Sequence, residues 1–533
     1  MNRHSLVALA LLAGCGDPPA PPPPPSPPPG PPPRLLAPWS GALLGGGRLT
    51  LRWTGEGAAR VTLCRGASAC TERRTLDANG GSLALTQTLP RGTWSWRVTR
   101  NGRDSATWRF TVTGSAERAQ HLGVRGDLDG DGRTELLVGA PGADGGRGRV
   151  WVLVAAEPQR ALTHDAERAS FGGSVAHVGD LDGDGFTDAA LGAPGAQVVR
   201  VYRGGPSGLA ESPWVTLANP EPGASGFGTA VAGVGDLDGD GYGELAVGSP
   251  FVSASTGRVY LWRGRPDALP ATPDKALDGP GGTAGLYGGD LTGAGDLDGD
   301  GLGELVVGAY RANSVAGAVY VYRGRRDLAT LTLDRTLGGA EGTGSYFGER
   351  VAGAGDLDGD GFPELAVGAP NTGRGLGRVY LFRGGSDGFD PMASRVLDPP
   401  EGASGSFGGA LGVHGDVNGD GLTDLVVGAP ASQRRAGRVV LFVGRAGAPP
   451  EGPGAVLESM SALGAEAGHA LAANGDHDGD GVDDLAVGVP QAREARGLVQ
   501  LVRGRTNALP SGPGVSFEPA VEGEAAVGSA LAR

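Results

Sequence analysis

The sequence predicts an all-β protein in which seven copies of one strand-rich unit stack or close into a ring. Three observations support this prediction. An acidic loop such as GDLDGDG recurs seven times, with first aspartates 53 to 60 residues apart. Each loop precedes an apolar run such as LLVGAP and then a β-branched and aromatic run such as GRVYLWRG. Helical capping and a 3.6-residue apolar period are absent from these units, which therefore indicate short strands joined by glycine turns.

The composition of the 533-residue chain is compatible with such a fold. Glycine and proline account for 101 and 40 residues, and aromatic residues make up only 5%. Without a repeat this content would suggest disorder, but a fold of many short strands and tight turns has the same composition. No apolar run approaches the roughly 18 residues that a membrane-spanning helix needs.

Residues 1–14 are predicted to be an export signal. A cationic start at Arg3, an apolar segment from Leu6 to Leu12 and small residues after it follow the pattern of a secretory signal peptide. Its end, the sequence LAGC, resembles a bacterial lipobox, which implies cleavage before Cys15 and attachment of lipid to that residue. The alternative is an ordinary secretory signal with an incidental cysteine. Because Gly16 rather than aspartate follows, we expect an outer-membrane or cell-surface lipoprotein that touches the membrane only through its lipid.

Residues 15–33 contain this cysteine and an almost continuous proline tract from Pro18 to Pro33. Such a tract favours the extended polyproline II conformation, at about 3.1 Å per residue, and would form a rod of roughly 50 Å. We expect the rod to hold the folded part of the chain away from a membrane surface.

Residues 34–114 are predicted to form a small β-sandwich. Short alternating runs such as LTLRW, RVTLC and TWSWRVTR are separated by glycine and asparagine turns. The pattern is similar to that of immunoglobulin and fibronectin type III domains. With Cys15 taken by lipid, Cys64 and Cys70 remain as a pair in an oxidising compartment, so we expect a disulfide that clips a loop or hairpin.

Residues 115–533 contain the seven units. Nine residues before the acidic loop, five units carry an aromatic residue followed by glycine, at Phe171, Phe227, Tyr287, Phe347 and Phe407. Unit 7 has Ala467 at this place, and unit 1 has no such pair. The end of the chain, AAVGSALAR, repeats the missing pattern with Val527 and Gly528. We therefore predict that this tail docks beside the first unit and pairs the last unit with the first.

The fixed order of the aromatic-Gly pair, the DxDGDGxx[DE] loop and the Gly-Ala-Pro run resembles the FG-GAP repeat of the integrin α-subunit head. The resemblance implies a seven-bladed β-propeller with one four-stranded blade per unit. It also implies that each acidic loop joins the first and second strands of its blade. Unit 2 departs from the pattern, because it is four residues shorter between Pro194 and Val198.

Each acidic loop has the ligand pattern of a calcium site. Aspartates at loop positions 1, 3 and 5, a backbone carbonyl at 7 and Asp or Glu at 9 supply hard oxygen donors, while glycines at 4 and 6 permit positive φ. Four carboxylates this close would otherwise repel one another, and Mg²⁺ prefers stricter octahedra. We expect up to seven Ca²⁺ ions that chiefly rigidify the fold, with loop 6 weaker because Asn418 is a neutral donor. The predicted ligands are Asp127, Asp129, Asp131, Arg133 and Glu135 in loop 1; Asp180, Asp182, Asp184, Phe186 and Asp188 in loop 2; Asp236, Asp238, Asp240, Tyr242 and Glu244 in loop 3; Asp296, Asp298, Asp300, Leu302 and Glu304 in loop 4; Asp356, Asp358, Asp360, Phe362 and Glu364 in loop 5; Asp416, Asn418, Asp420, Leu422 and Asp424 in loop 6; and Asp476, Asp478, Asp480, Val482 and Asp484 in loop 7.

The net charge agrees with this interpretation. The loops hold 27 of the 59 acidic residues, so the rest of the chain carries 32 acidic residues against 45 basic ones. Seven calcium ions would bring the formal charge of −14 close to zero. The acidity of the chain therefore reflects metal sites and does not indicate a basic partner, and no nucleic-acid partner is expected.

For function, we expect a non-enzymatic binding or adhesion lipoprotein. In the family that the chain resembles, the face opposite the calcium loops often holds the ligand. Arginines in the segments expected there would bind an anionic polysaccharide through charge-assisted hydrogen bonds, or are ordinary solvated side chains. A protein ligand, a structural envelope scaffold and a polysaccharide hydrolase or lyase are the alternatives; no nucleophile or zinc motif favours the enzyme. The arginines are Arg147, Arg311, Arg374, Arg434, Arg435, Arg493 and Arg496.

Overall fold

A computed structural model of the protein describes most of the chain beyond residue 34. The described residues are 35–37, 42–44, 48–53, 57–65, 70–85, 87, 89–90, 92–105, 107–112, 119–120, 126–131, 133–154, 156–184, 186–221, 223, 226–280, 284–339, 341–385, 388–457, 463–480, 482–506, 508–510, 514–519 and 525–532. The predicted export signal, Cys15 and the proline tract lie outside the described residues. Among those described, no helix is long and apolar enough to cross a membrane.

The first described strands form two sheets. One sheet contains β1 (Leu35–Ala37), β3 (Arg48–Trp53), β6 (Ser82–Ala84) and β10 (Ala119–Gln120). The other follows the order β2 (Ala42–Leu44), β9 (Trp108–Val112), β7 (Gly92–Arg100), β4 (Ala58–Arg65) and β5 (Glu72–Asn79), with β8 (Arg103–Asp104) paired to β7.

One buried cluster takes side chains from both of these sheets. Leu51 and Trp53 come from β3, whereas Val61 comes from β4 and Trp94 and Trp96 come from β7. Burial alternates along β4, as expected for a strand with one face in a core. These described tryptophans are therefore core residues and do not form an exposed platform.

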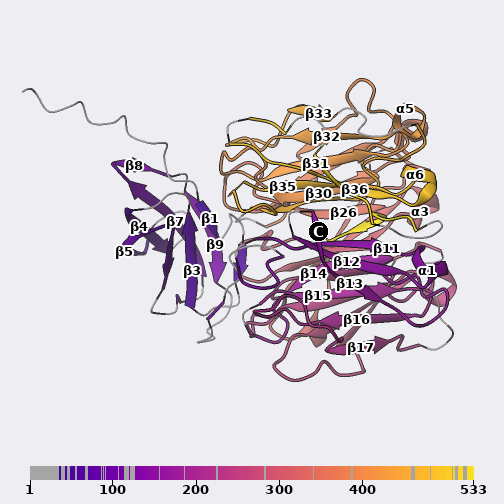
Figure 1. Ribbon diagram of the computed structural model, residues 1–533, viewed down its shortest axis with the longest axis horizontal. Coiled ribbons are helices and arrows are strands. Elements are labelled where there is room, and N and C mark those ends of the chain that lie inside the picture. Colours follow the sequence, from indigo (N-terminus) through magenta and orange to yellow (C-terminus); the bar gives the residue numbers. More distant parts are fainter. Residues whose placement is uncertain are drawn as a thin grey trace, which may run out of the picture. The chain divides into compact units, whose positions relative to one another are not determined.

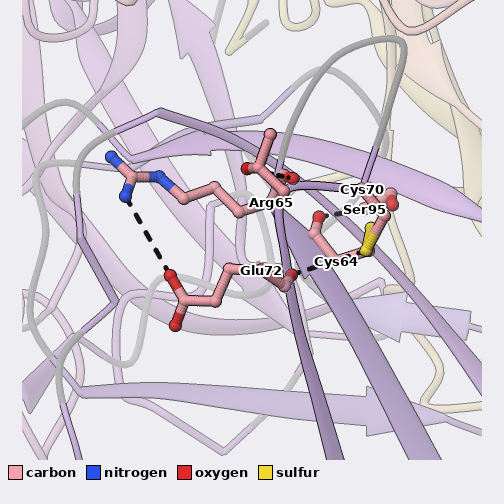
Figure 2. Close-up of a disulfide and its surroundings, with 6 residues drawn as sticks. Cys64, Arg65, Cys70, Glu72 and Ser95 are labelled. Atoms are coloured by element: carbon pink, nitrogen blue, oxygen red, sulfur yellow. Dashed lines mark hydrogen bonds and ion pairs between the residues drawn. A yellow bond between two sulfur atoms is a disulfide. The ribbon is translucent and has the colours of Figure 1, made fainter.

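The structure joins Cys64 and Cys70 in a disulfide, with a Cα–Cα distance of 5.4 Å. Cys64 lies near the end of β4 and Cys70 lies just before β5, its antiparallel neighbour. Figure 2 shows the bridge beside the ion pair between Arg65 and Glu72, and the Ser95 hydroxyl donates to the Cys64 carbonyl at 3.4 Å. The bridge thus ties together the two strands of a hairpin.

Beyond residue 126, the described strands form four-stranded antiparallel sheets that repeat along the chain (Figure 1). Five of these sheets are separate, and two more are joined into one eight-stranded sheet by a single parallel bridge between β30 and β34. From innermost to outermost strand they are β38 (Ala530–Leu531), β11 (Leu136–Ala140), β12 (Arg149–Val154) and β13 (Glu157–Thr163); β14 (Ser174–Gly179), β15 (Asp188–Ala193), β16 (Val198–Tyr202) and β17 (Val215–Ala218); β18 (Ala230–Gly233), β19 (Glu244–Ser249), β20 (Arg258–Arg263) and β21 (Lys275–Asp278); β22 (Asp290–Gly293), β23 (Glu304–Ala309), β24 (Ala318–Arg323) and β25 (Leu333–Leu337); β26 (Arg350–Gly355), β27 (Glu364–Ala369), β28 (Arg378–Arg383) and β29 (Arg395–Leu397); β30 (Ala410–Gly415), β31 (Asp424–Ala429), β32 (Arg438–Phe442) and β33 (Ala455–Leu457); and β34 (Leu471–Gly475), β35 (Asp484–Val489), β36 (Leu498–Val502) and β37 (Val515–Phe517).

The second strands of these sheets are buried along their whole length, for example β19, β23 and β27. A strand covered on both faces needs a nearly continuous apolar run, which is what LAVGS and LVVGA supply. The glycine of this run lies against the next sheet: a Cβ at Gly248 would collide with the Gly288 carbonyl oxygen, and one at Gly488 with that of Gly528. The glycine of the Gly-Ala-Pro run therefore packs on the glycine of the following aromatic-Gly pair.

The second and third strands are joined by tight turns that contain short helical segments. These are α1 (Ala143–Gly146), α2 (Val252–Ser255), α3 (Ala312–Val315), α4 (Thr372–Gly375), α5 (Ser432–Arg435) and α6 (Ala492–Ala495); a 3₁₀ turn, η1 (Leu328–Thr330), lies elsewhere. Each of the six contains three residues at positive φ, such as Asn313, Ser314 and Val315 in α3, so none continues as a regular helix. The expectation of strands and turns in the units agrees with this geometry.

The C-terminal tail pairs with the first sheet of the repeat region. In β38, Leu531 and Ala530 pair with Val138 and Gly139 of β11, and Figure 1 marks the C-terminus beside these strands. Val527 bridges Gly497 just as Tyr287 bridges Gly257 in an earlier unit. The tail thus supplies the element that unit 1 lacks, as its sequence pattern predicts.

Candidate metal centres

Six of the seven acidic loops join the innermost and second strands of a sheet, whereas loop 1 precedes β11 in a sheet whose innermost strand, β38, comes from the C-terminal tail. The residue at loop position 9 is the first residue of the second strand in six of the units, as Asp188 is in β15 and Glu244 is in β19. In unit 1, Glu135 directly precedes β11. The position implied by the family resemblance is therefore the one that the loops take.

The loops bring their carboxylates together. In five loops, one oxygen from each of three acidic residues lies within 4.8 Å of the other two, a spacing that one metal ion can bridge. These groups are Asp127, Asp129 and Glu135; Asp180, Asp182 and Asp184; Asp236, Asp238 and Glu244; Asp296, Asp298 and Asp300; and Asp356, Asp358 and Asp360.

Backbone hydrogen bonds orient the aspartates within each loop. In loop 3, the amide of Gly239 donates to Asp236 Oδ1 at 2.6 Å, and the amide of Asp240 donates to Asp238 Oδ1 at 3.2 Å. The amide of Tyr242 in turn donates to Asp240 Oδ1 at 3.0 Å. The same pattern recurs along the chain, so local sequence alone preorganises the donors.

The acid at position 9 divides the loops into two groups. In all seven loops, one of its oxygens accepts the amide of position 2, as Glu244 does from Leu237 at 2.6 Å. In loops 1, 3, 4 and 5 the acid is glutamate, and its other oxygen is buried and accepts no hydrogen bond. A buried oxygen of this kind is costly unless a cation reaches it, so these four loops fit a metal ion best.

In loops 2, 6 and 7 the acid at position 9 is aspartate, and the backbone takes both of its oxygens. Asp188, Asp424 and Asp484 accept a second hydrogen bond from the amides of Gly204, Gly444 and Gly504, at 3.0, 2.9 and 2.9 Å. The sequence predicts a ligand at position 9 in every loop. The structure shows that the shorter side chain already accepts a hydrogen bond from the glycine two residues after the third strand of its own sheet.

Burial makes these acids difficult to ionise without a cation. It raises the pKa of Glu135 to about 8, with Asp129, Asp127 and Asp131 adding repulsion and the Leu128 amide opposing it. Burial and neighbouring carboxylates likewise raise the pKa of Asp238 and Asp296 to about 7. For Glu244, Glu304 and Glu364, burial moves the pKa well above its usual value. A divalent ion with hard oxygen ligands, such as Ca²⁺, would reverse these shifts.

The comparison with known families agrees with the loop geometry. The FG-GAP repeat model matches residues 122–153, 171–206, 227–262, 288–322, 347–382 and 407–442. These six segments of the chain are FG-GAP repeats. The six matched segments end before the seventh predicted unit, in which Ala467 replaces the aromatic residue.

The FG-GAP segments are similar to integrin α chains. The chain is 36% identical to integrin alpha-IIb of Homo sapiens over 214 residues, which cover 37% of this chain and 20% of the integrin. It is 33% identical to integrin alpha-4 of Xenopus laevis over 191 residues, covering 35% and 18% of the two chains. The matched part thus spans about a fifth of the length of these relatives.

Solved structures with a similar arrangement are more distant. The Dos1 propeller is 12% identical, with a TM-score of 0.39, and the match covers 85% of this chain and 92% of that one. The exotype rhamnogalacturonan lyase YesX is 14% identical, with a TM-score of 0.33, and the match covers 93% and 76% of the two chains. TM-scores this low support no statement about function.

Five acidic loops are also paired with an arginine that the ligand pattern does not include. It is the last residue of the third strand or the residue directly after it, and it pairs with the aspartate at loop position 3. The Nε–Oδ2 distances are 2.5 Å for Arg203 and Asp182, 2.8 Å for Arg263 and Asp238, 2.9 Å for Arg383 and Asp358, and 3.1 Å for Arg503 and Asp478; Arg323 pairs with Asp298 in the same way. The signal in the sequence is the arginine that recurs in VYRG, LWRG, LFRG and LVRG.

Without bound metal, the FG-GAP region is expected to lose stability as the pH rises from about 4.5 to about 8. The pKa of Glu135 is about 8 in the folded chain against an ordinary 4.5, so in this window the folded state keeps a proton that the unfolded state has lost. Thermal scans in EDTA should show a Tm several degrees lower at pH 8 than at pH 5. With calcium the order should reverse, because the ion binds the ionised loops. A Tm in EDTA that rises steadily to pH 8 would contradict this expectation.

Proposed function

We propose that this FG-GAP protein is a calcium-stabilised binding module at the bacterial cell surface, made of a seven-bladed propeller behind a small β-sandwich. The propeller recognises an anionic polysaccharide, and a protein ligand is the alternative. The observation that carries the proposal is a set of exposed arginines at one end of the sheets, opposite the acidic loops. The protein is not an enzyme in this proposal.

Seven blades are supported by the way in which the innermost strands follow one another. β14 contacts β18, and the contacts continue through β22, β26, β30 and β34 to β38, which contacts β14. The last and first units also meet through Thr134, whose amide donates to the Asp476 carbonyl at 3.0 Å. The buried cluster shared by the two N-terminal sheets supports the β-sandwich. The lipobox-like end at Cys15 supports a lipid anchor.

Calcium is supported by the donor set of the loops and by the unpaired glutamate oxygens of loops 1, 3, 4 and 5. The residues that would hold the ion are the aspartates at positions 1, 3 and 5, with Asn418 at position 3 of loop 6, and, in these four loops, the glutamate at position 9. Bound calcium would neutralise the clustered carboxylates and so stabilise the turn between two strands. We propose up to seven ions, with a structural role.

The proposed ligand face is formed by the turns between second and third strands. Because each second strand begins at an acidic loop, these turns lie at the opposite end of the sheet. All seven arginines predicted for this face are exposed. Among the described residues, Arg147, Arg311, Arg374 and Arg434 make no ion pair, whereas Arg435 pairs with Glu466 and Arg493 with Glu518. Unpaired exposed guanidinium groups on several sheets suit a polymer with repeated carboxylate or sulfate groups.

A cavity of about 370 Å³ lies between the innermost strands. Arg350 and Asp290 begin their innermost strands, and His469 closely precedes β34, so these three lining residues lie toward the turn end. The carboxylate of Asp290 accepts the Val351 amide at 2.9 Å. Asp180 and Asp236 line the same cavity at the acidic-loop end, so polar groups lie at both of its ends.

Binding of the calcium-loaded full chain to anionic and neutral polysaccharides tests this proposal. Replacing Arg374 and Arg434 by glutamine should weaken binding to an anionic polysaccharide about tenfold or more, because each lost charged hydrogen bond contributes roughly 1.5–3 kcal/mol. Added salt should weaken wild-type binding. The matched control replaces Arg325 and Arg326, which are exposed and follow β24 at the acidic-loop end. Equal losses in the two variants, or a preference for neutral polymers, would argue against the proposal.

A further inference from the structure

The arginines that reach into the acidic loops follow a rule of position. They are Arg203, Arg263, Arg323, Arg383 and Arg503, called the loop arginines below. In the antiparallel register, Arg263 lies opposite Glu244, the residue at loop position 9, and Arg323 and Arg383 lie opposite Glu304 and Glu364. One strand register therefore brings a cation to the same point of each loop.

Each loop arginine meets a carboxylate that is buried. The side chains of Asp238 and Asp358 are only 1% and 0% exposed, whereas their partners Arg263 and Arg383 are 32% and 41% exposed. The other oxygen of each aspartate accepts the amide of loop position 5, at 3.2 Å in both loops. The guanidinium group thus lies within the cluster of carboxylates, while its opposite edge faces solvent.

The two loops without this arginine differ in an informative way. In loop 6, Val443 follows the third strand where an arginine would stand, and position 3 is Asn418 rather than aspartate. Loop 6 has lost one negative and one positive group together. In loop 1, Val154 stands opposite Glu135, but all four carboxylates are kept.

The charge of the loops is therefore nearly constant. Counted over the predicted ligands and the loop arginine alone, loops 2, 3, 4, 5 and 7 carry −3, and loop 6 carries −3 from three carboxylates without arginine. Loop 7 has a further acid, Asp483, which accepts the Asp416 amide of loop 6 at 2.8 Å. On the same count loop 1 carries −4, and its Arg133, at position 7, is exposed and lies against Gly479 of loop 7. In loop 6 the aspartate at position 3 and the arginine are both absent, whereas loop 1 keeps Asp129 without the arginine.

We propose that the loop arginines are built-in counter-cations that keep the loops folded when calcium is scarce and lower the affinity of each loop for calcium. The proposal rests on the proposed calcium binding of the FG-GAP loops. The guanidinium offsets the repulsion among the carboxylates, and the same positive charge repels an arriving Ca²⁺ ion. Loop 1, which has four ligand carboxylates and no arginine after its third strand, is then expected to bind calcium more tightly than loop 3.

Loop 3 provides a reporter for a single site. Tyr242 occupies position 7 there, and none of the other loops has tyrosine at that position. Tb³⁺ occupies calcium sites and emits when a nearby aromatic ring transfers energy to it. The part of the terbium emission that disappears in Tyr242→Phe therefore reports occupancy of loop 3, and displacement by calcium gives the calcium affinity of that loop.

The test compares Arg263→Met with Arg258→Met in the full chain. Both residues lie on β20, but Arg258 begins the strand and pairs with Glu221 and Asp278, away from the loop. For Arg263→Met we expect calcium to bind loop 3 about tenfold more tightly at low salt and less so at high salt. Its Tm in EDTA should fall, and the rise in Tm on adding calcium should exceed that of the unchanged chain. Arg258→Met should leave the calcium affinity unchanged.

Two results would overturn the inference while leaving calcium binding intact. Weaker calcium binding in Arg263→Met would mean that the arginine helps the carboxylates to bind calcium instead of lowering their affinity. An unchanged Tm in EDTA would mean that the arginine does not stabilise the metal-free loop. Absence of any calcium-displaceable terbium emission would instead reject the proposed calcium site.

Discussion

Removal of calcium with EDTA is expected to lower the Tm of the repeat region by ten degrees or more. Without the ion, Glu244, Glu304 and Glu364 each hold a buried oxygen that accepts no hydrogen bond. Ligand linkage gives about 2.7 kcal/mol per site when free calcium is 100 times the dissociation constant, and several sites act together. The loop arginines offset part of this loss, so the chain should stay folded at low temperature without metal.

Differential scanning calorimetry in EDTA, in Ca²⁺ and in Mg²⁺ measures this effect. Calcium should restore the Tm, and magnesium should restore less, because it prefers stricter octahedra than these loops offer. Residues 34–114 contain no acidic loop of this kind, so any separate transition from them serves as an internal control. A melting curve that is the same in EDTA and in calcium would reject metal stabilisation altogether.

The sequence predicts the loops and the sheets well, because both depend on local patterns. Alternating aspartates with glycines between them permit only a tight turn with its carboxylates turned to one side, and hydrogen bonds such as that of Gly239 to Asp236 lie within the loop. The aromatic-Gly pair and the Gly-Ala-Pro run are equally local, and the contact between Gly248 and Gly288 explains why both motifs keep their glycine.

Other features of the site depend on contacts that local patterns do not contain. The ion pair between Arg263 and Asp238 depends on the register in which the second and third strands pair. The difference between aspartate and glutamate at position 9 depends on where the second carboxylate oxygen lies. In Asp188 this oxygen reaches the Gly204 amide, whereas in the longer glutamate side chains it accepts no hydrogen bond from the described residues. Neither contact can be predicted from ligand residues at fixed spacing in the sequence.

The expectation for loop 6 changes for the same reason. Sequence reasoning predicts weaker calcium binding there because Asn418 is neutral. In the structure the arginine is missing from the same loop, so its net charge equals that of its neighbours. Charge alone then gives no reason for a weaker site, and any difference must come from the donor strength of an amide oxygen compared with a carboxylate.

Truncation of the chain after residue 523 is expected to lower the Tm of the repeat region by several degrees and to favour aggregation. The tail buries Val527 and Leu531, worth roughly 1.5–3 kcal/mol each. It also provides backbone hydrogen bonds, from the Gly528 amide to the Gly139 carbonyl at 3.0 Å and from the Val527 amide to the Arg496 carbonyl at 3.0 Å. Its loss would leave β11 as an exposed apolar edge strand, which is prone to pairing with other chains.

Two further variants separate the docking of the tail from chain length. Gly528→Val keeps the full chain but adds a side chain at φ +80°, where its Cβ would lie 2.8 Å from the Leu498 carbonyl oxygen, so it should destabilise as the truncation does. Ser516→Ala changes an exposed residue of β37 and should shift the Tm by less than about one degree. A synthetic peptide of residues 524–533 added to the truncated chain should recover part of the lost Tm. If the truncated chain melts at the same temperature as the full one, the proposal that the tail stabilises the repeat region by joining the last unit to the first is rejected.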